Sequence, residues 1–162
     1  MVDTAIKLAM TPELAVALAT PAYWMAVLLT LLLAGMTIGL HYEALQQLNQ
    51  RMPNWKLPPH PRVLVMMLCI LAVHILEIWL FGFGIYFAVQ VPGLGHLVGA
   101  EPLLLLDAVY ASATTYSTLG YGDLVPRGAL RFMFGTEALV GFLMVTWSAS
   151  FAYLEMQRYW RT

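Results

Sequence analysis

Hydrophobic residues along this chain gather in long runs, separated by short stretches that are rich in glycine, proline and polar side chains. Residues 22–40 form nineteen consecutive positions without a charge, which as a helix extend about 28 Å, roughly the thickness of the hydrocarbon layer of a bilayer. Residues 63–89 form a second, longer apolar run, and residues 129–157 form a third. The pattern predicts three membrane-crossing helices, of which the first can continue as a polar helix through residues 41–48.

A shorter apolar segment, residues 102–116, lies between the second and third runs and opens with the pair Glu101-Pro102, which is typical of a helix start. A helix of about fourteen residues extends about 21 Å, which is too short to cross a bilayer and suits a re-entrant segment. The other connections are expected to be irregular, with a proline-rich loop over residues 49–62 and a glycine-rich loop over residues 90–101.

Composition places this pattern in a membrane. Of the 162 residues, 60% are hydrophobic and 10% are charged, whereas a soluble domain carries about 25% charged residues. The chain is therefore predicted to be an all-α integral membrane protein, and its length suits a single domain. The net charge of −1 gives no indication of a nucleic-acid partner. The single cysteine, Cys69, cannot form an intrachain disulfide and is expected to be a small buried residue.

The first twenty residues are mildly amphipathic. Thr11 can cap a helix that begins at Pro12, so a helix over residues 12–19 is predicted, lying at the membrane interface or leading into the first run. A cleavable signal peptide is the competing interpretation, and Asp3 and Glu13 argue against it.

The stretch over residues 115–122 is neutral and glycine-spaced, and Asp123 follows it directly. Irregular backbone at membrane depth is tolerated only where it is buried in protein or lines a water-filled path. Gly120 and Gly122 can adopt positive φ without a steric penalty, so the carbonyls of residues 118–121 can turn to one side and form a ladder with the Thr118 hydroxyl. Neutral oxygens hold a monovalent cation weakly enough for it to leave. One ladder cannot surround an ion, so several copies of the chain are needed.

These residues also match a known motif. The order Thr115-x-x-Thr118-x-Gly120-Tyr121-Gly122, followed by Asp123, resembles the potassium-channel signature T-x-x-T-x-G-Y-G, with Leu119 where that signature usually has valine. The resemblance covers residues 63–157 and leaves residues 1–62 outside it. The chain resembles a small bacterial-type pore-domain member of the potassium-channel superfamily with an additional N-terminal transmembrane helix.

The resemblance implies a fold and an assembly. It implies three transmembrane helices plus a re-entrant pore helix and a selectivity filter, assembled as a homotetramer. Residues 1–62 would form an N-terminal region that holds the extra helix and a cytoplasmic loop, and residues 63–162 would form the pore domain. Within the pore domain the resemblance gives an outer helix over 63–89, a pore helix over 102–116, a filter over 117–123 and an inner helix over 129–157. Potassium ions would bind to the filter residues Thr118, Leu119, Gly120, Tyr121 and Gly122, with the first four as direct ligands.

Four residues outside this ladder are expected to support the filter, namely Thr115, Asp123, Tyr110 and Glu137. Asp123 matches the acid that holds the filter mouth in the family. Tyr110 stands in a region that usually carries tryptophan, so the rigidity of the filter is altered. Glu137 lies inside an apolar helix, where a charge is costly. It is predicted either to brace the back of the filter or pore helix, which would make the filter sensitive to pH, or to form an interhelical hydrogen bond with no regulatory role.

Glycines and two further polar residues complete the candidates. Gly135 and Gly141 can either let the inner helix bend as a gating hinge or allow close packing. Gly82 and Gly84, near the end of the second run, are expected to allow close helix–helix contact. His74 and Glu77, three residues apart on one helix face, can form half of a metal site, but a buried hydrogen-bonded pair is favoured because no second such pair exists.

The predicted function is passive, potassium-selective conduction that needs no cofactor beyond the permeant ion. A weakly selective monovalent cation channel and a non-conducting accessory subunit are the alternatives. No nucleophile–base set appears, so the chain is not expected to be an enzyme, and an intramembrane enzyme built on His74, Glu77 and Glu137 is a distant third. Five Lys and Arg residues against three favour a multi-pass protein of the plasma or bacterial inner membrane, with its N-terminus outside and its C-terminus cytoplasmic.

Overall fold

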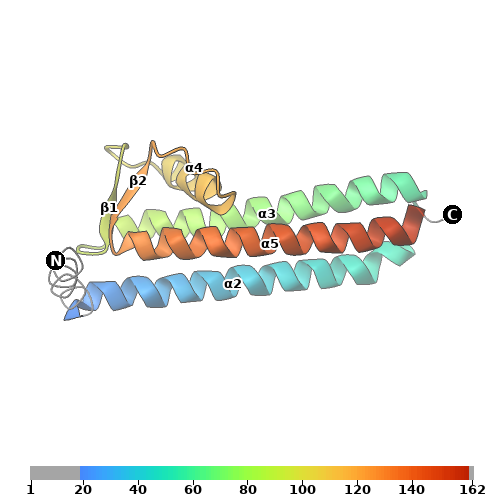
Figure 1. Ribbon diagram of the computed structural model, residues 1–162, viewed down its shortest axis with the longest axis horizontal. Coiled ribbons are helices and arrows are strands. Elements are labelled where there is room, and N and C mark those ends of the chain that lie inside the picture. Colours follow the sequence, from blue (N-terminus) through green and yellow to red (C-terminus); the bar gives the residue numbers. More distant parts are fainter. Residues whose placement is uncertain (1–18, 161–162) are drawn as a thin grey trace, which may run out of the picture.

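Three long helices run side by side along the length of the molecule, which a computed structural model describes from residue 19 to residue 160 (Figure 1). They are α2 (Pro21–Arg51), α3 (Pro59–Val89) and α5 (Leu130–Trp160), each of 31 residues. In this part of the chain, these three helices are long and apolar enough to cross a membrane. Each extends about 46 Å, which exceeds the roughly 30 Å of hydrocarbon in a bilayer. The helix expected over residues 12–19 and the alternative signal peptide lie outside the described residues, apart from Ala19.

Prolines account for where two of these helices begin. Pro21 occupies the first turn of α2, and Pro59 begins α3 four residues before the expected start at residue 63. A proline in the first turn of a helix removes an N–H that has no partner there in any case. The loop predicted over 49–62 is therefore mostly helical, since α2 continues to Arg51, a short 3-10 helix η1 (Met52–Asn54) follows, and α3 takes up the end of the range.

The short helix α4 (Leu105–Tyr116) has twelve residues and packs on α3 and α5 near one end of the bundle (Figure 1). It starts three residues after the predicted Pro102. The cap explains the later start, because the Asp107 carboxylate accepts a hydrogen bond of 2.9 Å from the backbone N–H of Leu104. At about 18 Å, α4 is too short to cross a bilayer.

A two-stranded antiparallel sheet lies in the stretches predicted to be irregular. Strands β1 (Gly95–Val98) and β2 (Val125–Gly128) pair antiparallel, with Gly95 opposite Gly128 and Val98 opposite Val125. Four-residue strands that begin or end in glycine give almost no period-two pattern, so the sequence did not indicate them. Strand β1 precedes α4 and β2 follows the glycine-spaced stretch, so the sheet joins the two ends of the segment that runs from α4 through this stretch (Figure 1).

Glycines bring α3 close to its neighbours, as predicted. A Cβ atom on Gly82 would lie 2.8 Å from the Cα of Val109 in α4, and one on Gly84 would lie 2.4 Å from a methyl carbon of Leu33 in α2. The contact of Gly82 is with backbone and depends on the missing side chain, which confirms the expectation of close helix packing, whereas a Cβ atom on Gly84 would meet the flexible end of Leu33. Gly82 therefore sets how closely α4 lies on α3.

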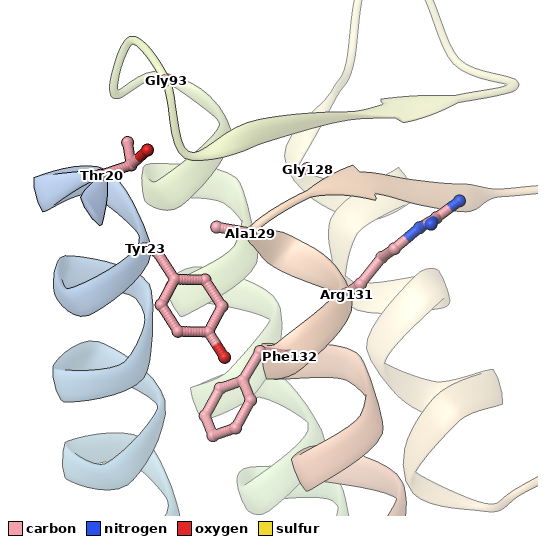
Figure 2. A pocket seen from close by; sticks show the side chains of 7 residues that line it. All are labelled: Thr20, Tyr23, Gly93, Gly128, Ala129, Arg131 and Phe132. Carbon is pink, nitrogen blue, oxygen red and sulfur yellow. The ribbon is translucent and has the colours of Figure 1, made fainter. Parts of the chain in front are cut away.

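A cavity of about 510 Å³ lies between the beginnings of α2 and α5, at the end of the bundle near the two-stranded sheet (Figure 2). The ring of Tyr23 points from α2 toward that of Phe132 on α5, and the ring centroids are 6.2 Å apart at a steep angle. Arg131 points away from this pair, and its Nε donates to the carbonyl of Pro126 at 3.4 Å. The cavity is lined by one arginine and otherwise by neutral residues, so it offers little polar chemistry.

Candidate ion-conduction site

The backbone of the predicted filter alternates in handedness. The φ angles of Thr118, Gly120 and Gly122 are +58°, +53° and +80°, and the intervening Leu119 and Tyr121 do not have positive φ. For a residue with a Cβ atom, the left-handed region costs about 1–2 kcal/mol. Thr118 therefore holds a strained conformation, which the chain keeps directly after the last turn of α4.

Residues 117–123 are all exposed in the single chain. A Cβ atom on Gly120 or Gly122 would meet nothing within 4 Å, so these glycines are needed for their backbone conformation and not for space. The start of the stretch is held to α4 by two backbone hydrogen bonds: Thr118 N–H donates to the Thr115 carbonyl at 2.9 Å, and Gly120 N–H donates to the Thr114 carbonyl at 3.0 Å. Thr115 thus meets the stretch through its carbonyl, while its hydroxyl bonds within α4.

Tyr116, the last residue of α4, fixes the inner end of the stretch. A Cβ atom on Gly141 would lie 2.1 Å from the carbonyl oxygen of Tyr116, so the backbones of α4 and α5 touch at this point. The Tyr116 side chain is buried, and its hydroxyl donates to the Glu77 carboxylate and lies 2.9 Å from Nδ1 of His74. This residue is therefore held against α5 through its backbone and against α3 through its side chain.

Asp123 fixes the outer end. The Tyr110 hydroxyl donates to its carboxylate at 2.8 Å, and this hydrogen bond raises the pKa of the Tyr110 phenol. A Cβ atom on Gly99, the residue after β1, would lie 2.1 Å from the Asp123 carbonyl oxygen. Two predicted support residues thus contact each other, and Gly99 joins them without having been singled out in the sequence.

Glu137 lies fully buried in α5 and meets the pore helix. Its Oε1 is 2.5 Å from the hydroxyl of Ser112 in α4, and that hydroxyl also lies 2.8 Å from the Ile78 carbonyl of α3. Its second carboxylate oxygen has no hydrogen-bond partner in the described part of the chain. The contact with α4 is therefore present, and its role in pH sensing stays a prediction. A Cβ atom on Gly135 would meet nothing within 4 Å among the described residues, whereas one on Gly141 would overlap the Tyr116 backbone, and the hinge also stays a prediction.

Sequence reasoning missed one buried residue, His41 of α2. Its Nδ1 lies 2.8 Å from Glu77, whose other oxygen lies 3.1 Å from Nδ1 of His74, and its Nε2 lies 3.2 Å from the Ser148 hydroxyl of α5. A signal was available, because Thr30 and Thr37 of the first apolar run and His41 directly after it place polar groups at helical spacing. All three are buried, so a polar stripe runs down the inner face of α2.

Comparison with known proteins agrees with this geometry. A family model described as "Ion channel" matches residues 73–156, which include the second half of α3, all of α4, the glycine-spaced stretch and most of α5. The protein named "Protein LctB" from Bacillus caldotenax is 46% identical over 41 residues, which are 25% of this chain and 31% of LctB. The chain therefore spans about a third of the length of this curated relative, and no solved structure matches significantly. Because the family model covers more than half of its residues, the chain belongs to the ion-channel family, a class of membrane pores and not of enzymes.

Proposed function

We propose that this protein is a potassium-selective channel that conducts K⁺ passively through Thr118 to Gly122. The observation that carries the proposal is the alternation of positive φ at Thr118, Gly120 and Gly122 within the sequence Thr-Leu-Gly-Tyr-Gly. Alternating handedness lets successive carbonyls turn to the same side, where they can replace the water around a potassium ion. Thr118, Leu119, Gly120 and Tyr121 would supply these oxygens, and Gly122 would complete the filter.

Exposure in the single chain supports assembly into a homotetramer. The side chains of Leu119 and Tyr121 are 56% and 68% exposed, although both are large and hydrophobic. On α5, Leu139 and Phe142 are 73% and 61% exposed, on a face turned away from the core of their own chain. Apolar groups left open in this way fit contact with neighbouring copies around an axis, with α5 as the inner helix.

Lipid would cover the outer faces of α2 and α3. Leu28 of α2 and Leu64 of α3 are 67% and 62% exposed on apolar helices, as lipid-facing leucines are. We place residues 63–162 as the pore domain and residues 1–62 as an additional region around α2. The outer end of the filter would face the outside of a plasma or bacterial inner membrane, with the N-terminus outside and the C-terminus cytoplasmic.

Flux through liposomes tests the proposal. The purified full chain, reconstituted in vesicles, should pass K⁺ down its gradient, be blocked by Ba²⁺, and pass Na⁺ far more slowly. Reversal potentials in mixed K⁺ and Na⁺ measure the selectivity, and comparable permeabilities would favour the weakly selective alternative. Absence of flux from a tetrameric, correctly folded preparation would overturn the proposal and favour an accessory subunit.

A further inference from the structure

Four polar side chains meet in the interior of the bundle, behind the inner end of the glycine-spaced stretch. His41 and Glu77 are fully buried, Tyr116 is 2% exposed, and the side chain of His74 is 15% exposed. Their elements are α2, α3 and the end of α4. Conduction through carbonyl oxygens makes no use of two imidazoles on one carboxylate, so this cluster calls for an explanation of its own.

We propose that His41, His74 and Glu77 form a binding site for a divalent transition-metal ion of the Zn²⁺ type, with the Tyr116 hydroxyl as the fourth ligand. The pair His74 and Glu77 alone supplies two ligands from one face of α3. His41 reaches the same carboxylate from α2, which completes the two-histidine, one-carboxylate set that binds zinc in proteins.

The ligand atoms are close enough for one ion. One atom each from His41, His74 and Glu77 lie within 4.8 Å of one another. Around a tetrahedral Zn²⁺ with bonds of about 2.0–2.2 Å, neighbouring ligand atoms are about 3.4 Å apart. The distances here are 2.8 Å from Nδ1 of His41 to Glu77 and 3.1 Å from Nδ1 of His74 to Glu77. Nδ1 of His41 faces Oε1 of Glu77 and Nδ1 of His74 faces Oε2, so each imidazole would move away by about half an ångström to admit the ion. The Tyr116 hydroxyl, which is in closer contact with Oε2, would move further.

The surroundings of the histidines also suit a metal. In metal sites the second ring nitrogen of a histidine ligand is held by a hydrogen bond that fixes the ring. His41 turns Nδ1 to Glu77, and its Nε2 lies 3.2 Å from the Ser148 hydroxyl. The Trp147 ring lies beside His41, with centroids 5.4 Å apart, and covers the imidazole with apolar surface. Ser148 therefore acts on the site by orienting His41.

Charge balance explains why Tyr116 completes the set. Inside a membrane, a buried net charge is costly. Two neutral imidazoles, the Glu77 carboxylate and a Tyr116 phenolate together neutralise a divalent cation. When the ion binds, the O–H bond of Tyr116 breaks, the oxygen–metal bond forms, and the proton leaves to solvent. The hydroxyl is already placed for this exchange, 2.9 Å from Nδ1 of His74.

A cavity lies beside the cluster. Its volume is about 280 Å³, it lies between α3 and α5, and both His74 and Ser148 line it beside Met67, Leu71 and Val145. His74 is the ligand with the largest exposed fraction. His74 is therefore the ligand at which the cluster borders this cavity.

The expected consequence, which rests on the proposed function, concerns the filter. Tyr116 directly precedes the glycine-spaced stretch, so a metal bond to its oxygen would tie the base of the filter to α2 and α3. Occupancy should then change K⁺ flux, whereas the binding itself can be measured in protein that conducts nothing.

The test uses the full chain carrying His60→Gln and His96→Gln as the background, because the four histidines of the chain are then reduced to the two in the cluster. After treatment with a chelator and dialysis against Zn²⁺, this protein should retain one Zn²⁺ per chain by elemental analysis. With Co²⁺ it should show the visible absorption of a tetrahedral site. His74→Gln in the same background should weaken Zn²⁺ binding at least about tenfold, and Tyr116→Phe should reduce the Co²⁺ absorption.

Retention of less than one Zn²⁺ per two chains by the background protein would overturn the site, as would unchanged binding after both His41→Gln and His74→Gln. A Glu77→Gln variant removes a fully buried ligand, and if it fails to fold, Zn²⁺ binding by His74→Gln, at the partly exposed ligand, still tests the site. Flux is measured on the chelator-treated protein: Zn²⁺ binding by a chain that passes no K⁺ in its chelator-treated form contradicts the channel proposal alone, and K⁺ flux without Zn²⁺ binding contradicts the metal site alone.

Discussion

The contact between α5 and the base of the filter gives the sharpest prediction, through the substitution Gly141→Ala. The added Cβ would lie 2.1, 2.8 and 2.9 Å from the O, C and Cα atoms of Tyr116. These are backbone atoms, which cannot rotate away. Ordinary contact begins at 3.4 Å, so the Cβ and the carbonyl oxygen must separate by 1.3 Å. The end of α4 and the middle of α5 must therefore move apart.

The magnitude follows from two opposing effects. Overpacking of this kind costs about 1–3 kcal/mol, occasionally more. Replacing glycine by alanine in a helix contributes about 1 kcal/mol of stability in return. Because the overlap involves three backbone atoms of Tyr116, the upper end of the overpacking cost applies, and Gly141→Ala should lower the free energy of unfolding by about 2 kcal/mol. Gly135→Ala is the matched control, because the same change in the same helix meets nothing within 4 Å, and it should leave stability unchanged or raise it by up to about 1 kcal/mol.

Both variants are to be compared in thermal or denaturant unfolding in detergent and in K⁺ flux from liposomes. Gly141→Ala should lose stability and flux together, since Tyr116 leads directly into the filter. A hinge makes a different prediction, namely a change in gating with stability kept or increased. Wild-type stability and flux for Gly141→Ala would refute the packing argument, and a stable variant with altered gating would establish the hinge in its place.

Three further substitutions test the contacts around α4. Ser112→Ala leaves the buried Glu137 carboxyl without its hydrogen bond and should lower the free energy of unfolding by about 1–3 kcal/mol. Glu137→Gln can keep a bond to Ser112 and should lower it less in the same unfolding assay. Equal losses for the two variants would contradict this assignment. At Gly120 there is space for a Cβ atom, but φ is +53°, so Gly120→Ala should introduce about 1–2 kcal/mol of backbone strain. This strain should lower K⁺ flux while helix content by circular dichroism stays the same, and wild-type flux would contradict the argument. Because the hydrogen bond to Asp123 raises the pKa of Tyr110 above its usual 10.0, the bond persists at neutral pH and is lost as the pH rises beyond that value. Tyr110→Phe should therefore shorten sustained K⁺ flux at pH 7 and differ little from wild type at strongly alkaline pH, and a difference that persists there would show another cause.

The membrane helices and the re-entrant helix could be predicted because their signals are local. A charge-free run of bilayer length specifies a membrane-crossing helix by itself. Gly82 and Gly84 of α3 likewise indicate close helix packing by residue type alone, because a glycine lets a neighbouring helix approach. The start of α4 was misplaced because the cap depends on Asp107, whose carboxylate reaches back to Leu104. The same local reasoning took Pro102 for the first residue of the helix.

The two-stranded sheet and the histidine cluster could not be predicted because they depend on contacts between distant segments. Strand β1 is separated from β2 by α4 and the filter, so neither strand has its partner in the local sequence. His41 meets Glu77 across 36 positions. The sequence showed His74 and Glu77 as a pair but did not show that a third helix would deliver another imidazole to the same carboxylate.

The stretch over residues 117–123 is fixed at its two ends and exposed between them. The inner end is fixed where Gly141 meets the Tyr116 backbone, and the outer end is fixed where Gly99 meets the Asp123 backbone. Each contact works because one partner lacks a side chain, so the position of the strand depends on backbone packing that side-chain motion cannot relax. The proposed function requires that the carbonyls between these ends stay free to bind ions, and a Cβ atom on Gly120 would meet nothing within 4 Å in the part of the chain that the structure describes. A strand anchored in this way can keep a strained Thr118, because releasing the strain would require one of the two backbone contacts to open.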